Sequence, residues 1–101
     1  MSETILIVDD EIDIGQLLSK FLEKKGYTTD YASNGKKGLE KAKKTSFDLV
    51  LCDFRLPDMD GLEAIQKFKS IDQNIKIIII TGYSDIKTAV KCMKSGASEY
   101  V

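Results

Sequence analysis

Apolar runs with the length of β-strands alternate along this chain with stretches that carry the period of an amphipathic helix. The runs fall at Thr4–Val8, Tyr27–Ala32, Asp48–Cys52, Lys76–Ile80 and Ser98–Val101. Strands joined through a helix pair in parallel, because parallel neighbours need a crossover connection. ILIV and IIII show no polar alternation, which is typical of strands covered on both faces. The pattern therefore predicts a three-layer α/β/α sandwich around a five-stranded parallel sheet.

The helical stretches between these runs have recognisable faces and ends. They are predicted at Glu11–Lys25, Asn34–Lys44, Gly61–Ser70 and Ser84–Ser95. The first carries one apolar stripe, formed by Ile14, Leu17, Leu18, Phe21 and Leu22. Gly26 and Gly96 stand where helix C-caps belong, and Asn34 and Ser84 stand where N-caps belong. Because the sequence stops within the fifth strand, the closing helix of such a fold is expected to be missing.

Length and composition favour one packed domain over residues 1–101. Apolar residues make up 43% of the chain and charged residues 31%, and the net charge is only −1. A charge so close to zero gives no electrostatic reason to expect nucleic acid or an anionic membrane as a partner. The start of the chain lacks a signal peptide, and Ile77–Ile80 falls far short of the roughly 20 apolar residues of a membrane helix. We therefore expect a cytoplasmic protein.

Two other features of the composition bear on function. Cys52 and Cys92 follow no metal-binding spacing and the chain has no His, so zinc is not expected. Lysines cluster in one predicted helix, at 36, 37, 41, 43 and 44. A solvated helix face is the ordinary interpretation of such a cluster, and a docking patch is the alternative.

Acidic residues gather where the predicted strands end. Asp9, Asp10 and Glu11 follow the first strand. Asp53 follows the third and Thr81 the fourth. Ligands of open parallel sheets bind beyond the carboxyl ends of the strands, at the point where strand order reverses. If the first, third and fourth strands are neighbours, these acids and one hydroxyl meet in a single crevice.

Each of these residues has an ordinary structural explanation when taken alone. Asp9 and Asp10 could cap a helix, Asp53 could open a turn, and Thr81 could simply end a strand. Together, two carboxylates about 4 Å apart would repel by roughly 4 kcal/mol at an effective dielectric constant of 20. A hard divalent cation offsets this repulsion, and Mg²⁺ suits an open site of carboxylates, a backbone carbonyl and waters. The shared placement therefore predicts a Mg²⁺ site.

The same segments resemble the receiver domain of two-component response regulators. ILIVDDE is similar to that family's first strand and acidic pair, DLVLCDFRLPDMDG to its phosphoacceptor strand and loop, and IIIITGYSD to its fourth strand with a hydroxyl residue. TGYSDIKTAVKCMKSGASEY is most similar to NtrC-type receivers, whose outputs act in transcription. The resemblance covers residues 1–101 and implies the flavodoxin-like sheet order 2-1-3-4-5. It also implies a C-terminally incomplete receiver, since the family's Lys would fall two residues past Val101.

The resemblance implies a role for each matching residue. Asp53 would be the phosphoacceptor, which takes a phosphoryl group in a Mg²⁺-dependent reaction. Asp10 would bind Mg²⁺ directly, and Asp9 would be its partner acting through water. Arg55 would offer the metal its backbone carbonyl. The chain would catalyse only its own phosphorylation and dephosphorylation, so it is not expected to be an enzyme on other substrates.

A switch and its partners are implied in the same way. Thr81 would donate a hydrogen bond to a phosphoryl oxygen, and Tyr100 would be the aromatic residue that changes rotamer on activation. The phosphodonor would be a sensor histidine kinase or a phosphotransfer protein, and activation would alter an output or dimerisation surface. Neither nucleic acid nor membrane is expected to bind this domain directly.

Three alternative functions fit the residues less well. The chain could be a receiver-like interaction module that works without phosphorylation. An aspartate-nucleophile hydrolase would place a second Asp two residues after the first, where Arg55 stands. A dinucleotide-binding protein would need a glycine-rich turn after the first strand, where Asp9, Asp10 and Glu11 stand instead.

Overall fold

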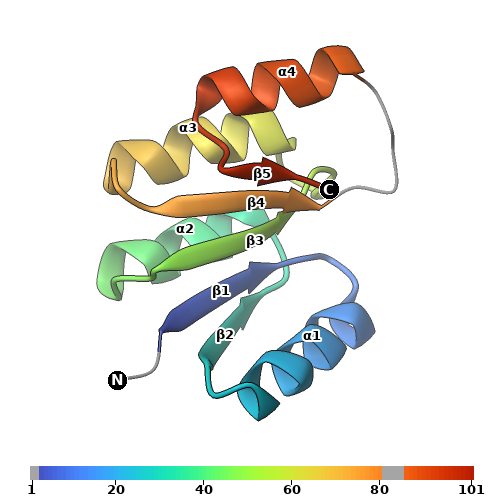
Figure 1. Cartoon of the computed structure of the whole chain (residues 1–101), viewed down its shortest axis with the longest axis vertical. Coiled ribbons are helices and arrows are strands. Elements are labelled where there is room, and N and C mark those ends of the chain that lie inside the picture. Colours follow the sequence, from blue (N-terminus) through green and yellow to red (C-terminus); the bar gives the residue numbers. More distant parts are fainter. Residues whose placement is uncertain (1–2, 81–85) are drawn as a thin grey trace.

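The computed structural model describes residues 3–80 and 86–101, and its elements alternate as the sequence predicts (Figure 1). The strands are β1 (Thr4–Val8), β2 (Thr28–Ala32), β3 (Leu49–Asp53), β4 (Lys76–Ile80) and β5 (Glu99–Tyr100). The helices are α1 (Ile12–Lys24), α2 (Gly35–Lys44), α3 (Gly61–Ile71) and α4 (Ile86–Ser95). The most useful difference from the predicted bounds is that Asp53 is the last residue of β3, so the strand itself fixes its backbone.

The five strands form one parallel sheet in the order β2-β1-β3-β4-β5, which confirms the expected topology. The register pairs Val8 of β1 with Cys52 of β3. Because both strands run in the same direction, the residues that follow this pair, Asp9 and Asp53, emerge side by side at the same edge of the sheet. The position of the acids is thus set by strand register.

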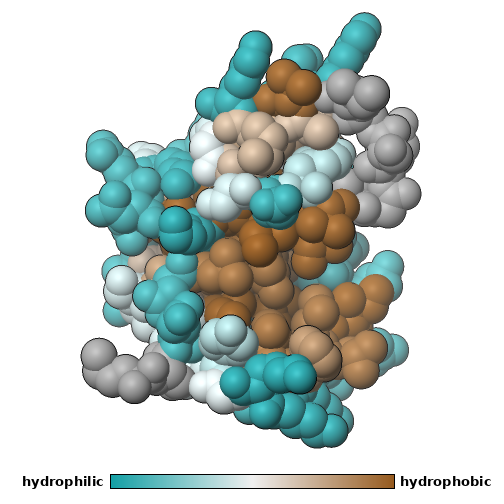
Figure 2. Space-filling view, in the orientation of Figure 1, coloured by the Kyte–Doolittle hydropathy of each residue, from teal (hydrophilic) through white to brown (hydrophobic). Residues whose placement is uncertain are grey.

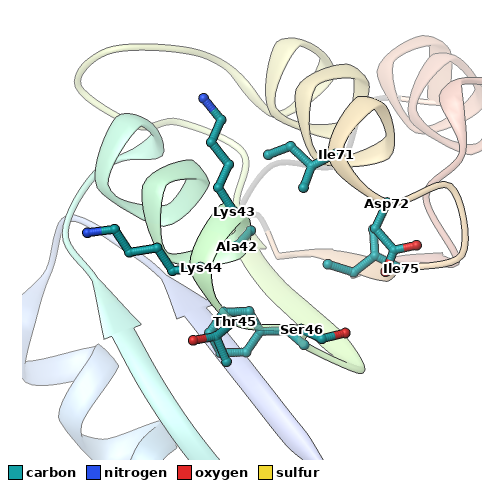
Figure 3. Close-up of a pocket in the computed structure, with 9 residues that line it drawn as sticks. Ala42, Lys43, Lys44, Thr45, Ser46, Ile71, Asp72 and Ile75 are labelled. Atoms are coloured by element: carbon teal, nitrogen blue, oxygen red, sulfur yellow. The ribbon is translucent and has the colours of Figure 1, made fainter.

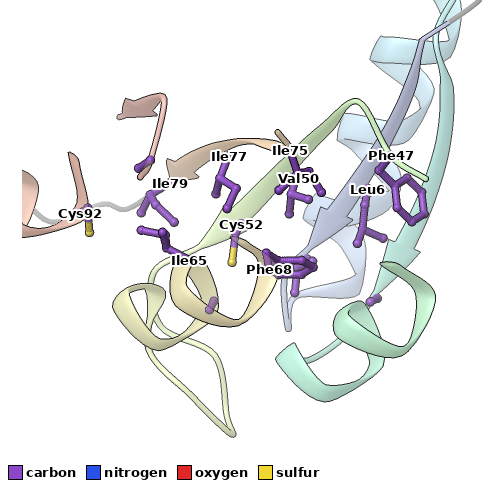
Figure 4. Packing of buried hydrophobic residues seen from close by; sticks show 14 residues of the cluster. Leu6, Phe47, Val50, Cys52, Ile65, Phe68, Ile75, Ile77, Ile79 and Cys92 are labelled. Carbon is purple, nitrogen blue, oxygen red and sulfur yellow. The ribbon is translucent and has the colours of Figure 1, made fainter. Parts of the chain in front are cut away.

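The main hydrophobic core lies between the sheet and helices α2, α3 and α4 (Figure 4). Alternate strand residues point into it, among them Leu6, Val8, Val50, Cys52, Ile77 and Ile79, all buried. From α3, Ala64, Ile65 and Phe68 are fully buried against them. Both cysteines are buried and free, which agrees with their interpretation as small hydrophobic side chains. This packing holds β1, β3 and β4 in place.

The opposite face of the sheet is only partly covered. Helix α1 contacts β1 and β2 there, so Ile5 and Ile7 are buried. The side chains that β3 and β4 present to this face remain half-exposed, namely Leu49, Leu51, Ile78 and Ile80. Apolar surface gathers over the middle of the view in Figure 2. This matches the expectation of a fold whose closing helix is missing.

The apolar stripe predicted along α1 is divided in the structure. Leu18 and Leu22 are half-buried, whereas the exposed fractions of Ile14, Leu17 and Phe21 are 42%, 70% and 57%. The reason is geometric: α1 lies against β1 and β2, and only one side of its stripe meets them. Among the described residues, no helix is long and apolar enough to cross a membrane.

The predicted helix ends are largely confirmed. Gly26 and Gly96 have φ angles of 98° and 116°, a left-handed conformation that favours glycine after a helix. Asn34 caps α2, because its side-chain oxygen accepts a hydrogen bond from the N–H of Lys37 at 2.8 Å. The N-cap predicted at Ser84 lies outside the described residues.

We predict opposite outcomes for two large-to-small substitutions. Phe68→Ala should lower the free energy of unfolding by about 3–5 kcal/mol, since the ring is fully buried. Leu17→Ala should change it by no more than about 0.5 kcal/mol, since that side chain is 70% exposed. Urea unfolding followed by circular dichroism measures both. Comparable losses in the two variants would contradict the arrangement of α1 described above.

Candidate functional site

Three carboxylates meet at the carboxyl edge of the sheet. Asp9 and Asp10 follow β1, and Asp53 ends β3. One carboxylate oxygen from each residue lies within 4.8 Å of the other two. Asp9 and Asp53 are half-buried, and Asp10 is exposed. The convergence that strand positions predicted is therefore present for these three carboxylates, of which Asp9 and Asp53 are 44 positions apart in the chain.

Backbone hydrogen bonds hold the β1 side of this cluster. The N–H of Asp9 donates to the carbonyl of Ala32 at 3.1 Å, which continues the pairing of β1 with β2. The carboxylate of Asp9 accepts from the N–H of Glu11 at 2.9 Å, just ahead of α1. This bond turns the chain ahead of α1 but does not cap the helix, because Glu11 is itself the N-cap residue and no side-chain capping bond is made there. The helix cap suggested for Asp9 in the sequence is therefore not observed.

Sequence reasoning missed Tyr31, which supports the cluster from β2. Its hydroxyl donates a hydrogen bond to the backbone carbonyl of Asp9. The ring reaches this position only because Gly15 of α1 has no side chain, since a Cβ there would lie 2.2 Å from the Tyr31 ring. A glycine in the middle of a predicted helix was the available signal, because such a residue usually has a packing reason.

Asp53 stands in an environment that disfavours its charge. Burial raises the pKa of this carboxyl group, and the negative charge of Asp9 raises it further. Asp10 and Glu11 act in the same direction, while the N–H of Arg55, 3.4 Å from the carboxylate, opposes them. The site is therefore an unbalanced negative cluster. Its oxygen atoms are the ligands that hard divalent cations prefer.

Two side-chain caps near α3 hold the second half of the loop that follows Asp53. Asp58 accepts hydrogen bonds from the N–H groups of Gly35 and Lys36, both at 2.9 Å, and so caps α2 from a distant part of the chain. Asp60 caps α3 by accepting from the N–H of Glu63 at 2.9 Å. Burial raises the pKa of Asp58, but the N–H groups of Lys36 and Gly35 lower it more, so the net shift is downward. No local pattern in the sequence signals the contact of Asp58 with α2.

The other predicted site residues differ in what the structure says of them. Arg55 lies in the loop directly after β3, and its proposed role through the backbone carbonyl stays a prediction. Tyr100 is half-buried on β5, where it packs against the core cluster beside β4, and its role as a switch also stays a prediction. Thr81 lies outside the described residues.

The fold and the site together define a class of protein. A doubly wound parallel sheet in the order 2-1-3-4-5, with acids at the ends of β1 and β3, is a flavodoxin-like α/β fold with an acidic rim at its switch point. Residues 5–101 match the family model described as the response regulator receiver domain. The chain belongs to this family, and its receiver is of the phosphoacceptor kind found in two-component response regulators.

Individual relatives agree with this assignment. Transcriptional regulatory protein ZraR of Klebsiella oxytoca is 43% identical over 96% of this chain, which spans only 22% of that protein's length. A CheY-like response regulator receiver domain protein from Methanospirillum hungatei has a TM-score of 0.95 and 35% identity, with 100% of this chain and 81% of that chain covered. A response regulator from Burkholderia pseudomallei, crystallised with a phosphorylated aspartic acid, calcium ion and citrate, has a TM-score of 0.92 and 30% identity over 98% of this chain and 58% of that one.

We predict that removing one charge from the cluster stabilises the cation-free protein. Asp53→Asn keeps the shape of the side chain but ends its repulsion with Asp9, which is worth about 1 kcal/mol for charges 4.8 Å apart in water. The free energy of unfolding at pH 7 in a chelating buffer should rise by an amount of this order. Glu40→Gln, an exposed change on α2, is the control and should have little effect. A loss of stability in Asp53→Asn would contradict the description of the cluster.

Asp58 should make the stability depend on pH in a defined direction. Its folded pKa lies below its unfolded value, so its contribution is complete above about pH 4 and is lost as the pH falls through the folded pKa. Asp58→Asn should therefore be less stable than the wild type at pH 7, and the difference should shrink toward pH 3. Urea unfolding at a series of pH values measures this. A constant difference across the series would show that the cap does not depend on the charge.

Proposed function

We propose that this receiver accepts a phosphoryl group on Asp53 in a Mg²⁺-dependent reaction and that the phosphorylated form presents a changed surface to its partners. The observation that supports the proposal most strongly is the approach of the Asp9, Asp10 and Asp53 carboxylates to within 4.8 Å of one another, with Asp53 held at the end of a central strand. Phosphoacceptor chemistry needs a carboxylate that is fixed, accessible and close to charge-neutralising ligands.

The residues present suit a divalent cation. Asp10 and Asp53 would bind Mg²⁺ directly, Asp9 would act through water, and the backbone carbonyl of Arg55 would complete the protein's share of ligands. When bound, the ion supplies positive charge that offsets the acids and the incoming phosphoryl oxygens. The B. pseudomallei structure holds both a phosphorylated aspartic acid and a calcium ion, and this combination is consistent with the proposal.

Asp53 performs the bond-forming step in this proposal. One of its carboxylate oxygens attacks the phosphorus of a phosphohistidine or a small phosphodonor, in line with the bond that breaks. The new bond joins oxygen to phosphorus, and the electron pair of the broken bond leaves with the donor. No general base is required, since a carboxylate carries no proton at pH 7, and this fits a chain without His. Hydrolysis of the acyl phosphate returns Asp53 to its starting state.

The chain acts on itself in this scheme and is a regulator, as receiver domains are. The donor would be a sensor histidine kinase or a phosphotransfer protein. The chain spans about a fifth of the length of ZraR, so a role in transcription would need a region outside these 101 residues. We expect the whole regulator to resemble the NtrC type in carrying such an output.

Phosphorylation would change the shape of the site through its charge. A phosphoryl group adds negative charge and strong hydrogen-bond acceptors beside Asp53. Thr81 would donate a hydrogen bond to it, and Tyr100, half-buried on β5, would turn inward. The surface of α4 and β5 would then favour dimerisation or output. Moving such a two-state balance from 1:99 to 99:1 takes about 5.5 kcal/mol.

We predict one labile phosphoryl group per chain after incubation with acetyl phosphate and Mg²⁺. Intact-mass spectrometry should detect it in the wild type and in Asp58→Asn, whose altered carboxylate lies in the same loop. Asp53→Asn should carry none, and omission of Mg²⁺ should abolish the modification of the wild type. Equal phosphorylation of Asp53→Asn would refute the assignment of Asp53, and absence of phosphorylation in the wild type would favour the interaction module that works without phosphorylation.

A further inference from the structure

A groove runs along the seam between α2 and α3, on the far side of the main core from α1. It consists of three adjoining cavities of about 340, 310 and 320 Å³. The first and second share Leu39, Lys43 and Lys67, and the second and third share Lys43 and Ile71. The three cavities are therefore one continuous surface depression. Figure 3 shows its last third, where Lys43 of α2 and Ile71 of α3 lie on opposite sides.

The floor of this α2/α3 groove is apolar. Leu39 and Met59 are half-buried and pack against the core cluster, and Ile71 at the end of α3 is also half-buried. These side chains are held in place by the core below them, so the floor is present before any partner arrives. A fixed apolar floor favours a ligand that offers aliphatic side chains at intervals.

The walls carry positive charge from both helices. In the middle cavity, Lys43 of α2 and Lys67 of α3 stand on either side of the floor, and no carboxylate lines this part. Lys67 forms an ion pair with Glu63 at 2.8 Å. Both side chains are about half-exposed, so the pair is weak and a carboxylate of a ligand could replace Glu63. Across residues 3–80 and 86–101, Lys43 forms no ion pair.

Carboxylates also line the two ends of the groove, and two of the three are already engaged. Asp58 accepts the N–H groups of α2, and Asp72 accepts the N–H of Asn74 at 2.9 Å. Glu40 lies on α2, a helix that has five lysines and a single acidic residue. Across the three cavities four lysines face these three carboxylates, so the net positive charge is small overall. It is concentrated in the middle of the groove, where Lys43 and Lys67 stand without a lining carboxylate.

We propose that the α2/α3 groove is a docking site for an acidic, amphipathic segment of a partner protein. Aliphatic side chains of the segment would rest on Leu39 and Ile71, and its carboxylates would pair with Lys43 and Lys67. Three of the five lysines of α2, namely Lys36, Lys43 and Lys44, line the groove and would then do more than form a solvated face. Nucleic acid fits less well, because the apolar floor offers nothing to phosphates and the chain as a whole has a net charge of −1. The groove is separate from the Asp9, Asp10 and Asp53 cluster, so this proposal stands independently of phosphorylation.

The test is a titration of the unphosphorylated, isotope-labelled protein followed by NMR. The probe is a synthetic helical peptide with Leu at every third or fourth position and Glu elsewhere. Matched probes are the same peptide with Lys in place of Glu, and a short DNA duplex. We expect the acidic peptide to shift the amide signals of α2 and α3 around Leu39, Lys43, Lys67 and Ile71, and to bind more tightly than either matched probe.

Two charge reversals make the result specific to the groove. Lys43→Glu should weaken binding of the acidic peptide roughly fivefold or more, because an attraction becomes a repulsion. Lys20→Glu makes the same change of net charge on an exposed position of α1 and should leave binding unchanged. Equal effects of the two variants would assign binding to overall charge and overturn the proposal. So would absence of binding, shifts confined to the exposed apolar face of α1, or tighter binding of the DNA duplex.

Discussion

The mutual repulsion of three carboxylates at one edge of the sheet is the constraint around which this structure is arranged. Asp9 and Asp53 face one another because β1 and β3 pair in register, and that register is held by buried side chains such as Leu6, Val50 and Phe68. The folding energy of the core thus keeps together charges that would separate if they were free to move. This confinement raises the pKa of Asp53, first through burial and then through the negative charge of Asp9.

The crowding of negative charge determines which ligands the site can bind. A carboxylate that is crowded by other carboxylates gains from a positive partner, so the cluster favours a bound cation. Phosphoryl acceptance adds further negative charge, so in this proposal it depends on that cation. Asp9 takes part in several interactions at once: its N–H continues the sheet, its carboxylate accepts from Glu11, and its carbonyl accepts from Tyr31. The acidic rim is therefore positioned by the backbone more than by contacts among the acids.

Much of this arrangement could be predicted from the sequence, because it follows from local patterns and from the rules of parallel sheets. Strand runs, glycine caps and the acids at strand ends are all visible in short windows of sequence. The contacts that escaped prediction join residues about 20 positions apart by hydrogen bonds to single backbone groups. Tyr31 reaching Asp9 and Asp58 reaching Gly35 are of this kind, and no periodicity signals them. The exposure of Leu17 escaped for another reason, since a periodic stripe does not reveal how much of it a neighbour will cover.

Asp58 connects the two functional regions inferred here. It lies in the loop that begins after Asp53, it caps α2, and it lines one end of the α2/α3 groove. A displacement of this loop would act on α2 through two backbone hydrogen bonds. The loop that carries Asp58 therefore links the acidic rim to the groove, although the two sites are proposed to bind ligands of opposite charge.

Among the clustered acids, we propose Asp53 as the residue that accepts the phosphoryl group. The most direct measurement is to treat the phosphorylated protein with borohydride, which reduces an aspartyl phosphate to homoserine, and to locate the change by tandem mass spectrometry. We expect homoserine at position 53 and nowhere else, and only when Mg²⁺ was present during phosphorylation. Homoserine at position 9, 10 or 58, or an unmodified Asp53 in a phosphorylated protein, would contradict it.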